Sequence, residues 1–491
     1  MAKRVAIIDI GSNSIRMVVY EKTSRFAFHL LHEEKSKVRI SQNAYKHNGE
    51  LQEEPMQRTF DALHDFLQIS QSFKVKKILC VATSALRDAP NRAQFLQRVK
   101  SKLKLKIRVI SGEKEAYFGA IACANLLPKQ QNAISIDIGG GSTEISFIDG
   151  NNVSNTLSLK LGTVRLKELF FDSGDIEGAK LYIDRELERI ASTEITTLIG
   201  IGGTFRAISN AIMKRCNYPL NKLHAFEYTA ATFNEYIQKL LNAANEDELK
   251  SLGIKSNRFD VIQPGTLILA RIMKRLDITK IITSGVGVRE GVYLSDLLRN
   301  TKDKFPHNYN TSVRYILDAH VADKEYSNHL SLLSKRIFDL TYEFFNINKE
   351  YRAALSLAAK LYPAGSSVHF YSQNKHTYYL IQSALEYGFT HKDITLIATL
   401  TKYAKKRLPA ESHLQKYSTL LPEDAQQTKA LSFLLSLTIA LLSHRPRNID
   451  FEMSFEDGKL LIESKKRLYI TKNAVKSIAC SNQDFKVVFN T

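Results

Sequence analysis

Two short segments of the chain combine an acidic residue with glycine and small polar side chains, and each lies between two apolar runs. Residues 5–20 read VAIIDIGSNSIRMVVY and residues 133–148 read AISIDIGGGSTEISFI. In both segments the run that ends in Asp-Ile-Gly is typical of a buried strand, and a second apolar run follows the small residues directly. This spacing predicts a β-hairpin, because a Rossmann or P-loop site would lead into a helix.

The tips of both hairpins have the composition of an anion-binding site. Glycine lets the backbone approach a ligand closely, and consecutive N–H groups in such a turn form a concave site for phosphate. Side chains of serine, threonine and asparagine add further donors. We therefore expect phosphate to be bound by the tip residues, which are Gly11, Ser12, Asn13, Ser14, Gly139, Gly140, Gly141, Ser142 and Thr143.

Acidic residues flank both tips. Asp9 and Asp137 end the first strand of each hairpin, and Glu144 follows the second tip. Carboxylates at these positions can hold Mg²⁺ together with water molecules and phosphate oxygens. Two ordinary glycine turns are the alternative interpretation. However, two copies 128 residues apart, each opening an α/β unit, favour a duplicated domain that faces itself across a cleft.

Alternating strands and helices must position these residues up to about residue 300. The apolar patterns predict strands over 5–10, 15–20, 26–32, 76–82, 107–110, 133–138, 144–148, 196–201 and 280–283. They predict helices over 54–71, 91–102, 113–127, 164–171, 204–214 and 261–275. This alternation indicates α/β layering.

The chain is too long for a single hydrophobic core, and its pattern changes along its length. We expect two α/β domains over 1–128 and 129–300, and a polar linker within 299–312. Helical apolar spacing predicts a third domain over 313–445, and alternation predicts a small β region over 446–491.

The composition carries a large positive charge. Lys and Arg total 69 against 50 Asp and Glu, a net charge of +19, which suggests a polyanionic partner or serves solubility alone. No zinc-finger, RRM or KH signature is present, so we expect no specific nucleic-acid partner. The longest apolar run, residues 431–442, is too short to cross a bilayer, and we expect a buried helix there and no membrane partner. Scattered cysteines and the lack of a signal-peptide pattern favour a cytoplasmic location.

Seven motifs in matching order resemble the exopolyphosphatase and guanosine pentaphosphate phosphohydrolase family, within the actin, Hsp70 and sugar-kinase superfamily. They are DIGSNSIR (9–16), ATSALRDAPN (82–91), ISGEKEA (110–116), DIGGGSTE (137–144), LGTVRL (161–166), GIGGTFRA (200–207) and SGVGVREGV (284–292). The resemblance implies two actin-like (ribonuclease H-like) domains facing a cleft, Mg²⁺ and a homodimer. It also implies removal of the terminal phosphate from polyphosphate or guanosine pentaphosphate, an activity of the stringent response.

Hydrolysis of a phosphoanhydride needs charge neutralisation, an in-line water molecule and a base. Arg87 follows a predicted strand, and its guanidinium group can grip two phosphate oxygens. Glu115 begins a predicted helix, whose dipole favours an ionised carboxylate. Glu113 would serve equally well on local grounds, but the resemblance selects Glu115 as the base. We expect Glu144 to bind metal or water, and the opposite assignment of the two remains open.

Further glycines precede predicted helices in the second domain. Gly202, Gly203 and Thr204 open a helix after a strand, where free N–H groups favour an anion, and Arg206 is placed to assist. Gly285 and Gly287 resemble a second turn of this kind, although both turns can serve packing alone. Arg16 is a weaker candidate, because a residue on a strand can face solvent.

The helical domain departs from relatives that resemble HD-type metal phosphohydrolases. Tyr362 and Pro363 occupy the place of the His-Asp pair, and Tyr326 stands where an upstream histidine is expected. His376 alone does not make a metal site, so we expect no metal chemistry in this degenerate HD-like domain. The domain instead serves dimerisation or a basic groove, for which the candidate residues are Lys375, Lys402, Lys405, Lys406 and Arg407.

Two other functions remain open for this fold superfamily. A kinase would need a pocket for an acceptor alcohol and a complete adenosine site, and no feature of the sequence demands either. A sensor that binds a phosphate-rich ligand without turnover would not need a base, whereas Glu115 and Glu144 are both present.

Overall fold

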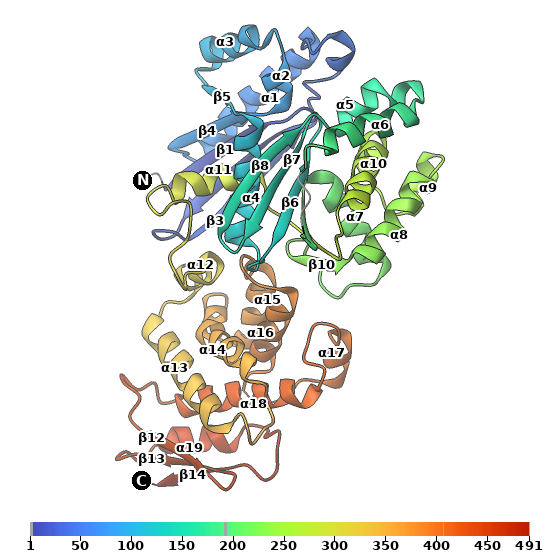
Figure 1. The fold of residues 1–491 in the computed structure, drawn as a ribbon. Coiled ribbons are helices and arrows are strands. Elements are labelled where there is room, and N and C mark those ends of the chain that lie inside the picture. The colour runs from blue at the N-terminus through green and yellow to red at the C-terminus, as the bar shows by residue number, and fades with distance from the viewer. Residues whose placement is uncertain (1–2, 191–193, 406, 491) are drawn as a thin grey trace. The chain divides into compact units, whose positions relative to one another are not determined.

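The computed structural model describes residues 3–190, 194–405 and 407–490, and the chain divides into two compact units, Met1–Tyr309 and Asn310–Thr491 (Figure 1). The division falls inside the polar segment 299–312. The first unit carries both glycine-rich hairpins on two β-sheets, and the second is mainly helical. None of the described helices combines the length and the hydropathy that crossing a lipid bilayer requires.

The first sheet has the strand order β3-β2-β1-β4-β5. Its antiparallel strands are β1 (Arg4–Ile10), β2 (Ile15–Lys22) and β3 (Phe28–Ser36), and its parallel additions are β4 (Lys77–Ala82) and β5 (Ile107–Val109). β1 is almost entirely buried, which explains its continuous apolar sequence. We call this sheet the first lobe, together with η1 (Tyr45–His47), α1 (Glu53–Ser72), α2 (Ser84–Asp88) and α3 (Arg92–Leu103).

The second sheet repeats this topology. Its order is β10-β11-β9-β6-β7-β8, so that β6 to β9 and β11 correspond to β1 to β5, and β10 is an additional edge strand. The strands are β6 (Ala133–Ile138), β7 (Thr143–Asp149), β8 (Asn152–Leu159), β9 (Thr197–Ile201), β10 (Phe226–Thr229) and β11 (Lys280–Thr283). The predicted duplication into two actin-like α/β domains is therefore confirmed.

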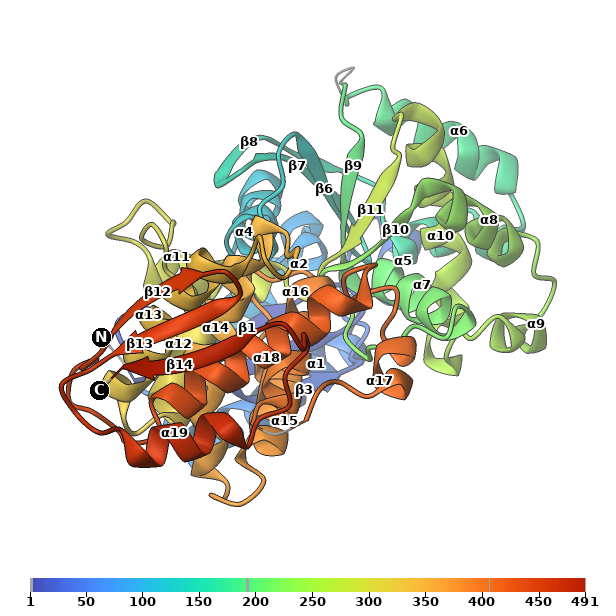
Figure 2. The same cartoon turned by 90° about the horizontal axis from the view of Figure 1, so that it is seen from below.

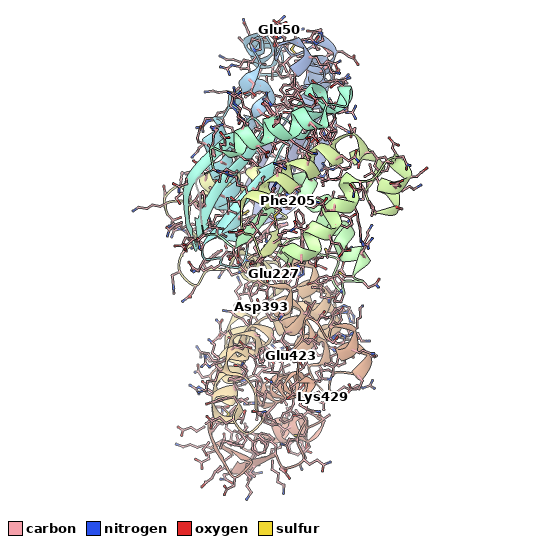
Figure 3. All side chains as sticks on the ribbon, turned by 45° about the vertical axis from the view of Figure 1, so that its right-hand side comes forward. Glu50, Phe205, Glu227, Asp393, Glu423 and Lys429 are labelled. Carbon is pink, nitrogen blue, oxygen red and sulfur yellow. The ribbon has the colours of Figure 1, made fainter. Side chains whose placement is uncertain are left out.

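Helices of the second sheet enclose a large apolar core. Phe205, labelled in Figure 3, is fully buried among the isoleucines and leucines of this core. We call this sheet and its helices the second lobe. The helices are α5 (Thr163–Leu169), η2 (Phe171–Ser173), α6 (Ile176–Leu187), α7 (Gly202–Arg215), α8 (Ala230–Leu241), α9 (Glu246–Ser251), η3 (Ser256–Arg258) and α10 (Phe259–Arg275).

Two helices connect the lobes by crossing between them. α4 (Gly112–Leu126) ends the first repeat but contacts β7 and β8 of the second sheet, whereas α11 (Val288–Leu297) ends the second repeat and contacts β1 (Figure 1). The two helices also pack on each other. Tyr20 on β2 stacks on Tyr293 of α11 with ring centroids 4.5 Å apart, and its hydroxyl donates to Glu290 Oε1 at 2.7 Å.

The second unit combines helices with a small three-stranded sheet. Its helical elements are α12 (Thr311–His320), α13 (Lys324–Thr341), η4 (Lys349–Tyr351), α14 (Arg352–Leu361), η5 (Tyr362–Ser367), α15 (Gln373–Ala384), α16 (His391–Tyr403), α17 (Glu411–Lys416), α18 (Ala425–Leu441) and α19 (Tyr469–Lys476). Figure 2 shows the strands side by side as β12 (Glu452–Glu456), β13 (Lys459–Glu463) and β14 (Lys486–Asn490). The buried helix predicted over 431–442 is confirmed as part of α18.

In the first unit the sequence does not predict β8, β10, α2, α6, α8, α9 or α11. β8 is a half-exposed edge strand with a polar sequence, and β10 has only four residues. α11 is buried on nearly all sides, so it lacks the amphipathic pattern that marks a surface helix. The strand predicted over 26–32 begins later, as β3 over Phe28–Ser36.

The contact between α4 and α11 yields a stability prediction. A Cβ atom on Gly291 of α11 would lie 1.9 Å from the backbone oxygen of Phe118 on α4, which cannot move alone. We expect Gly291→Ala to lower the free energy of unfolding by about 1–3 kcal/mol in urea denaturation.

Gly119→Ala on the facing helix is the matched control. A Cβ atom there would meet nothing closer than 3.5 Å, so the change should be neutral or stabilise by up to about 1 kcal/mol. Equal destabilisation by both substitutions would contradict this account of the helix contact.

Candidate active site

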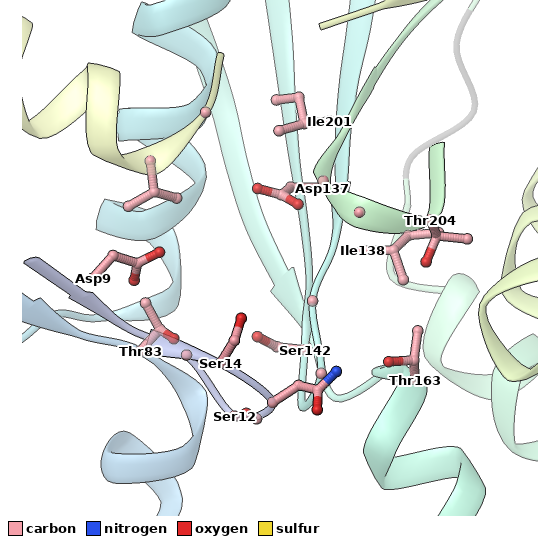
Figure 4. A pocket seen from close by; sticks show the side chains of 18 of the residues that line it. Asp9, Ser12, Ser14, Thr83, Asp137, Ile138, Ser142, Thr163, Ile201 and Thr204 are labelled. Carbon is pink, nitrogen blue, oxygen red and sulfur yellow. The ribbon is translucent and has the colours of Figure 1, made fainter. Parts of the chain in front are cut away.

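A cavity of about 160 Å³ lies between the tips of the two hairpins (Figure 4). Asp9 on β1 and Asp137 on β6 lie on opposite sides of it, and Ser12, Ser14 and Ser142 approach one another at the tips. The strand registers explain which neighbours join them. Residues directly opposite in an antiparallel pair point to the same face of the sheet. Asp9 pairs with Arg16 and Asp137 pairs with Glu144, and all four line the cavity.

The backbone carbonyl groups of the first tip are hydrogen-bonded from behind. Ser12 O accepts the N–H of Ser41 at 3.3 Å and its hydroxyl at 3.2 Å. Asn13 O accepts the N–H of Arg39 at 3.0 Å, and Ser14 O accepts that of Gly11 at 3.2 Å. Among the described residues, none accepts a hydrogen bond from the N–H groups of residues 12–14.

The second tip is built in the same way, with the start of α5 behind it. Gly139 O accepts the N–H of Thr163 at 3.0 Å, and Gly140 O accepts that of Val164 at 2.8 Å. Gly141 O accepts Nε of Arg165 at 2.8 Å. The described part of the chain offers no acceptor to the N–H groups of residues 140–142. Both tips therefore keep a row of amide donors available for an anion.

Two buried glutamates flank these amide donors. Glu115 on α4 is 8% exposed and Glu144 on β7 is 3% exposed. Arg87 Nη1 donates to Glu115 Oε2 at 2.8 Å, and Arg87 Nη2 lies 3.9 Å from Glu144 Oε1. The Ser158 hydroxyl donates to the same Glu144 oxygen at 2.9 Å.

Burial and repulsion by a neighbouring carboxylate raise the pKa of both glutamates. Burial and the charge of Glu144 raise the pKa of Glu115 well above its usual value. Burial, with a smaller contribution from Asp137, raises the pKa of Glu144 to about 7. A carboxylate with a raised pKa accepts a proton more readily, which is the property that a general base requires.

Asp9 and Asp137 fit a divalent cation. Asp9 Oδ1 is buried without a hydrogen-bond partner among the described residues. A Cβ atom on Gly202, whose φ is +87°, would lie 2.4 Å from Asp137 Oδ1, so glycine keeps space beside that oxygen. Burial raises the pKa of Asp9 and brings that of Asp137 to about 6, and a cation would relieve this cost. No group of three or more potential metal ligands occurs in the described chain. Mg²⁺ suits such a sparse site, because water and phosphate oxygens complete its shell.

One wall of the cavity is strongly cationic. Its members are Arg16, Lys35, Arg206, Arg258 and Arg289. Burial and the charges of Arg16 and Arg258 lower the pKa of Lys35 to about 8. Arg289 Nη1 pairs with Glu33 Oε1 at 2.6 Å, whereas the side chains of Lys35 and Arg258 have no hydrogen bond or ion pair with another described residue. These two cations are therefore available to an anionic ligand.

The structure brings most of the predicted residues together. Gly11, Ser12, Asn13, Ser14, Gly139, Gly140 and Ser142 line the cavity, as do Gly203, Thr204 and Arg206 at the start of α7. Arg16 also lines it, so the solvent-facing interpretation of that residue is wrong. The Arg206 side chain donates to Ser284 O at 3.1 Å. Gly287 lines the cavity, but the N–H of Gly285 donates to His224 and that of Gly287 to Glu290.

Besides Gly285, three predicted residues do not line the cavity: Arg87, Gly141 and Thr143. Thr143 is fully buried, and its hydroxyl donates to Leu161 O at 2.7 Å, so it braces the tip instead of facing a ligand. Arg87 lies behind the cavity between the two glutamates and also donates to the Ser142 hydroxyl at 3.3 Å. Gly141 packs against Tyr45 and Ser84.

Sequence reasoning missed several residues of the site, namely Lys35, Thr83, Ser84, Thr163, Arg258 and Arg289. Arg289 lies within the quoted motif SGVGVREGV, Thr163 within LGTVRL, and Thr83 and Ser84 within ATSALRDAPN, so a signal was present for these four. Lys35 and Arg258 carry no such local signal. They reach the cavity from the ends of β3 and η3.

The residues singled out in the helical unit lie in ordinary packed surroundings. Tyr362 and Pro363 begin η5 and are buried. The Tyr326 ring packs under Arg445, whose guanidinium carbon lies 3.8 Å from the ring centroid. His376 is half-buried on α15. The absence of metal chemistry in this unit stays a prediction.

The basic groove predicted in the helical unit is only partly available. Lys375, Lys405 and Arg407 are exposed, but Lys402 Nζ donates to His413 Nδ1 at 3.1 Å. Lys406 lies outside the described residues. A ligand-binding role for this surface stays a prediction.

Two actin-like lobes, paired hairpins with available amide donors and buried carboxylates together are typical of an enzyme of the actin-like fold that acts on phosphate groups. The chain belongs to the Ppx/GppA phosphatase family, whose model matches residues 18–300. The model of Ppx/GppA phosphatase domain III matches residues 310–475 of the helical unit.

Named relatives are similar to this chain in sequence or in fold. A guanosine-5'-triphosphate,3'-diphosphate pyrophosphatase of Photobacterium profundum is 27% identical over 477 residues, covering 93% of this chain and 90% of that protein. The Ppx/GppA family member of Aquifex aeolicus is 28% identical in its crystal structure, covers 63% of this chain and 100% of its own, and has a TM-score of 0.53. An exopolyphosphatase of Cytophaga hutchinsonii, 24% identical, covers 62% of this chain and 100% of its own and shares the fold with a TM-score of 0.56.

Support of the second tip by α5 yields a binding prediction. A Cβ atom on Gly162 would lie 2.4 Å from the oxygen of Gly140 and 2.5 Å from the carbonyl carbon of Gly141. Gly162→Ala must displace α5 or the tip, so we expect it to weaken binding of inorganic phosphate by at least about tenfold in calorimetry.

Gly174→Asn, in the same lobe, is the control. No atom lies within 4 Å of a Cβ atom at Gly174, and asparagine tolerates its φ of +76°. Unchanged phosphate affinity in Gly162→Ala would show that the tip does not depend on α5.

Proposed function

We propose that this protein hydrolyses the terminal phosphoanhydride bond of a linear phosphate chain, with inorganic polyphosphate and guanosine pentaphosphate as the substrates to test. The observation that carries the proposal is the placement of Glu115 and Glu144, both buried, beside two rows of amide donors. Such donors stabilise charge on a transferring phosphoryl group, and a nearby carboxylate supplies the base.

In the proposed reaction the terminal phosphate lies between the two tips. Glu115 Oε2 is held by Arg87, which leaves Oε1 to accept a proton from water. The water oxygen attacks the terminal phosphorus as the bridging P–O bond breaks. The products are inorganic phosphate and a chain one phosphate shorter, whose new terminal oxygen carries the leaving electron pair. Glu144 orients the water or binds metal in this scheme.

Asp9 and Asp137 would hold the Mg²⁺ that the family resemblance implies. When bound, the ion would neutralise phosphate oxygens and so favour charge transfer to the leaving chain. The protein's own contribution is to present the unpartnered Asp9 oxygen and the space beside Asp137 on the two sides of the cavity.

The cationic wall suits the remainder of the chain. A terminal phosphate alone does not need five further cations, whereas a longer polyanion does. The names of the Photobacterium and Cytophaga relatives both refer to polyanions with phosphoanhydride bonds, a guanosine pentaphosphate in one and polyphosphate in the other. These names support the proposed substrate class without separating the two substrates.

Loss of the base should abolish turnover. We expect Glu115→Gln to lower kcat for phosphate release from either substrate by about 10²–10⁴-fold, because the amide cannot accept the proton from water. Glu113→Gln is the matched control, since Glu113 lies on the same turn of α4 but is exposed. An equal loss in both variants, or full activity in Glu115→Gln, would exclude Glu115 as the base.

Loss of the available cations should act on chain binding. We expect Lys35→Met and Arg258→Met each to raise KM for long polyphosphate by about tenfold and to change KM for tripolyphosphate much less. Lys102→Met removes the same charge from the exposed part of α3 and should leave both KM values unchanged. A uniform rise in KM for short and long chains would contradict binding by the cationic wall of phosphates beyond the terminal one.

A further inference from the structure

The side chain of Arg165 contacts the second tip and the first lobe at the same time. Arg165 is the third residue of α5, and its side chain is 12% exposed. Its Nε donates to Gly141 O at 2.8 Å, and its backbone N–H donates to Gly140 O at 3.1 Å. It therefore holds two of the three carbonyl groups that are turned away from the anion-binding face of this tip.

The other end of the same guanidinium group is held by the first lobe. Nη2 of Arg165 donates to Asp88 Oδ2 at 2.6 Å, at the end of α2. The guanidinium carbon also lies 4.4 Å from the ring centroid of Tyr45 in η1. Because the guanidinium group is rigid and planar, Asp88 and Tyr45 fix the plane in which Nε can donate to Gly141 O.

Separation of the lobes would remove this constraint. Asp88 and Tyr45 would move away with the first lobe, while Gly141 and Arg165 would stay together in the second. The guanidinium group would then be free to rotate, and the peptide between Gly141 and Ser142 would lose its fixed orientation. The N–H group of that peptide is one of the amide donors of the second tip.

We propose that Arg165 is a positioning residue that makes the anion affinity of the second tip depend on closure of the two lobes. The first lobe thereby acts on the tip through Asp88, in addition to contributing its own hairpin. The inference deepens the proposed function, since a site coupled in this way would assemble fully only around a bound phosphate chain.

Other contacts between the lobes do not touch the tip and supply a control. Lys46 Nζ pairs with Asp172 at 2.7 Å, and Glu168 accepts the N–H groups of Asn43 and Tyr45 at 2.8 and 3.2 Å. The Lys46 pair joins η1 of the first lobe to η2 of the second lobe. Lys46→Gln therefore weakens closure without removing a contact to Gly141.

A double-mutant cycle tests the coupling. Binding of inorganic phosphate is measured by calorimetry for Arg165→Gln, Asp88→Asn and the double variant of the full chain. We expect each single substitution to weaken binding by about tenfold, and the double variant to be no weaker than Arg165→Gln alone. For Lys46→Gln combined with Arg165→Gln, the two effects should multiply.

Multiplying effects of Arg165→Gln and Asp88→Asn would overturn the proposal. That result would mean that Asp88 acts by another route, such as its 3.9 Å approach to Arg87. If Arg165→Gln does not fold, Arg165→Lys takes its place in the cycle, because lysine keeps the charge but not the planar fork. Calorimetry needs no turnover, so a wild-type protein that releases no phosphate from either substrate would refute the proposed function while the cycle still decides the coupling.

Discussion

The active site depends on one constraint of the backbone, which is that the carbonyl groups of both hairpin tips are occupied from behind. A peptide group that donates to a ligand must turn its carbonyl away, and a buried carbonyl needs a partner of its own. Residues 39–41 supply the partners of Ser12 O and Asn13 O in the first tip, and residues 163–165 supply those of the carbonyl groups of residues 139–141 in the second. In each repeat the supplying segment follows the third strand, β3 or β8. Duplication has therefore preserved the donor arrangement together with the strand order.

This constraint allows the fold to concentrate like charges in one cavity. Asp9, Asp137, Glu115 and Glu144 approach from four different elements, and burial raises the pKa of each. The cationic wall carries an opposite excess with two members left unpaired. The carboxylates and the cations do not fully neutralise each other. A bound phosphate chain would pair with the cations, and its counter-ion would pair with the carboxylates. Burial of these charges lowers the folding stability of the lobes and prepares the cavity for a charged ligand. Shifted pKa values of this kind are common in active sites.

Features set by neighbours in the sequence could be predicted, and features set by packing could not. Each hairpin is formed by residues that are close together in the sequence. Its two strands, its tip and the side of the sheet on which Glu144 lies can therefore be predicted from the residues of the hairpin itself. Arg16 was within reach of the same reasoning, because its register opposite Asp9 places it on the cleft side. The positions of Lys35 and Arg258 depend instead on how the ends of β3 and η3 pack against segments that are remote in the sequence. Thr143 was misjudged for the same reason, since its hydroxyl finds Leu161 only after β8 has returned to β7.

The exchange of α4 and α11 between the lobes also orders events during synthesis of the chain. The strands of the first lobe are complete at residue 109, yet Tyr20 on β2 has its aromatic and hydrogen-bonding partners on α11, beginning at Val288. A nascent chain emerging from the ribosome must therefore hold the first sheet with one face uncovered while about 180 further residues are translated, at about 5–20 residues per second. For that interval, on the order of ten seconds or more, the first sheet exposes apolar surface of the kind that promotes aggregation of incomplete chains.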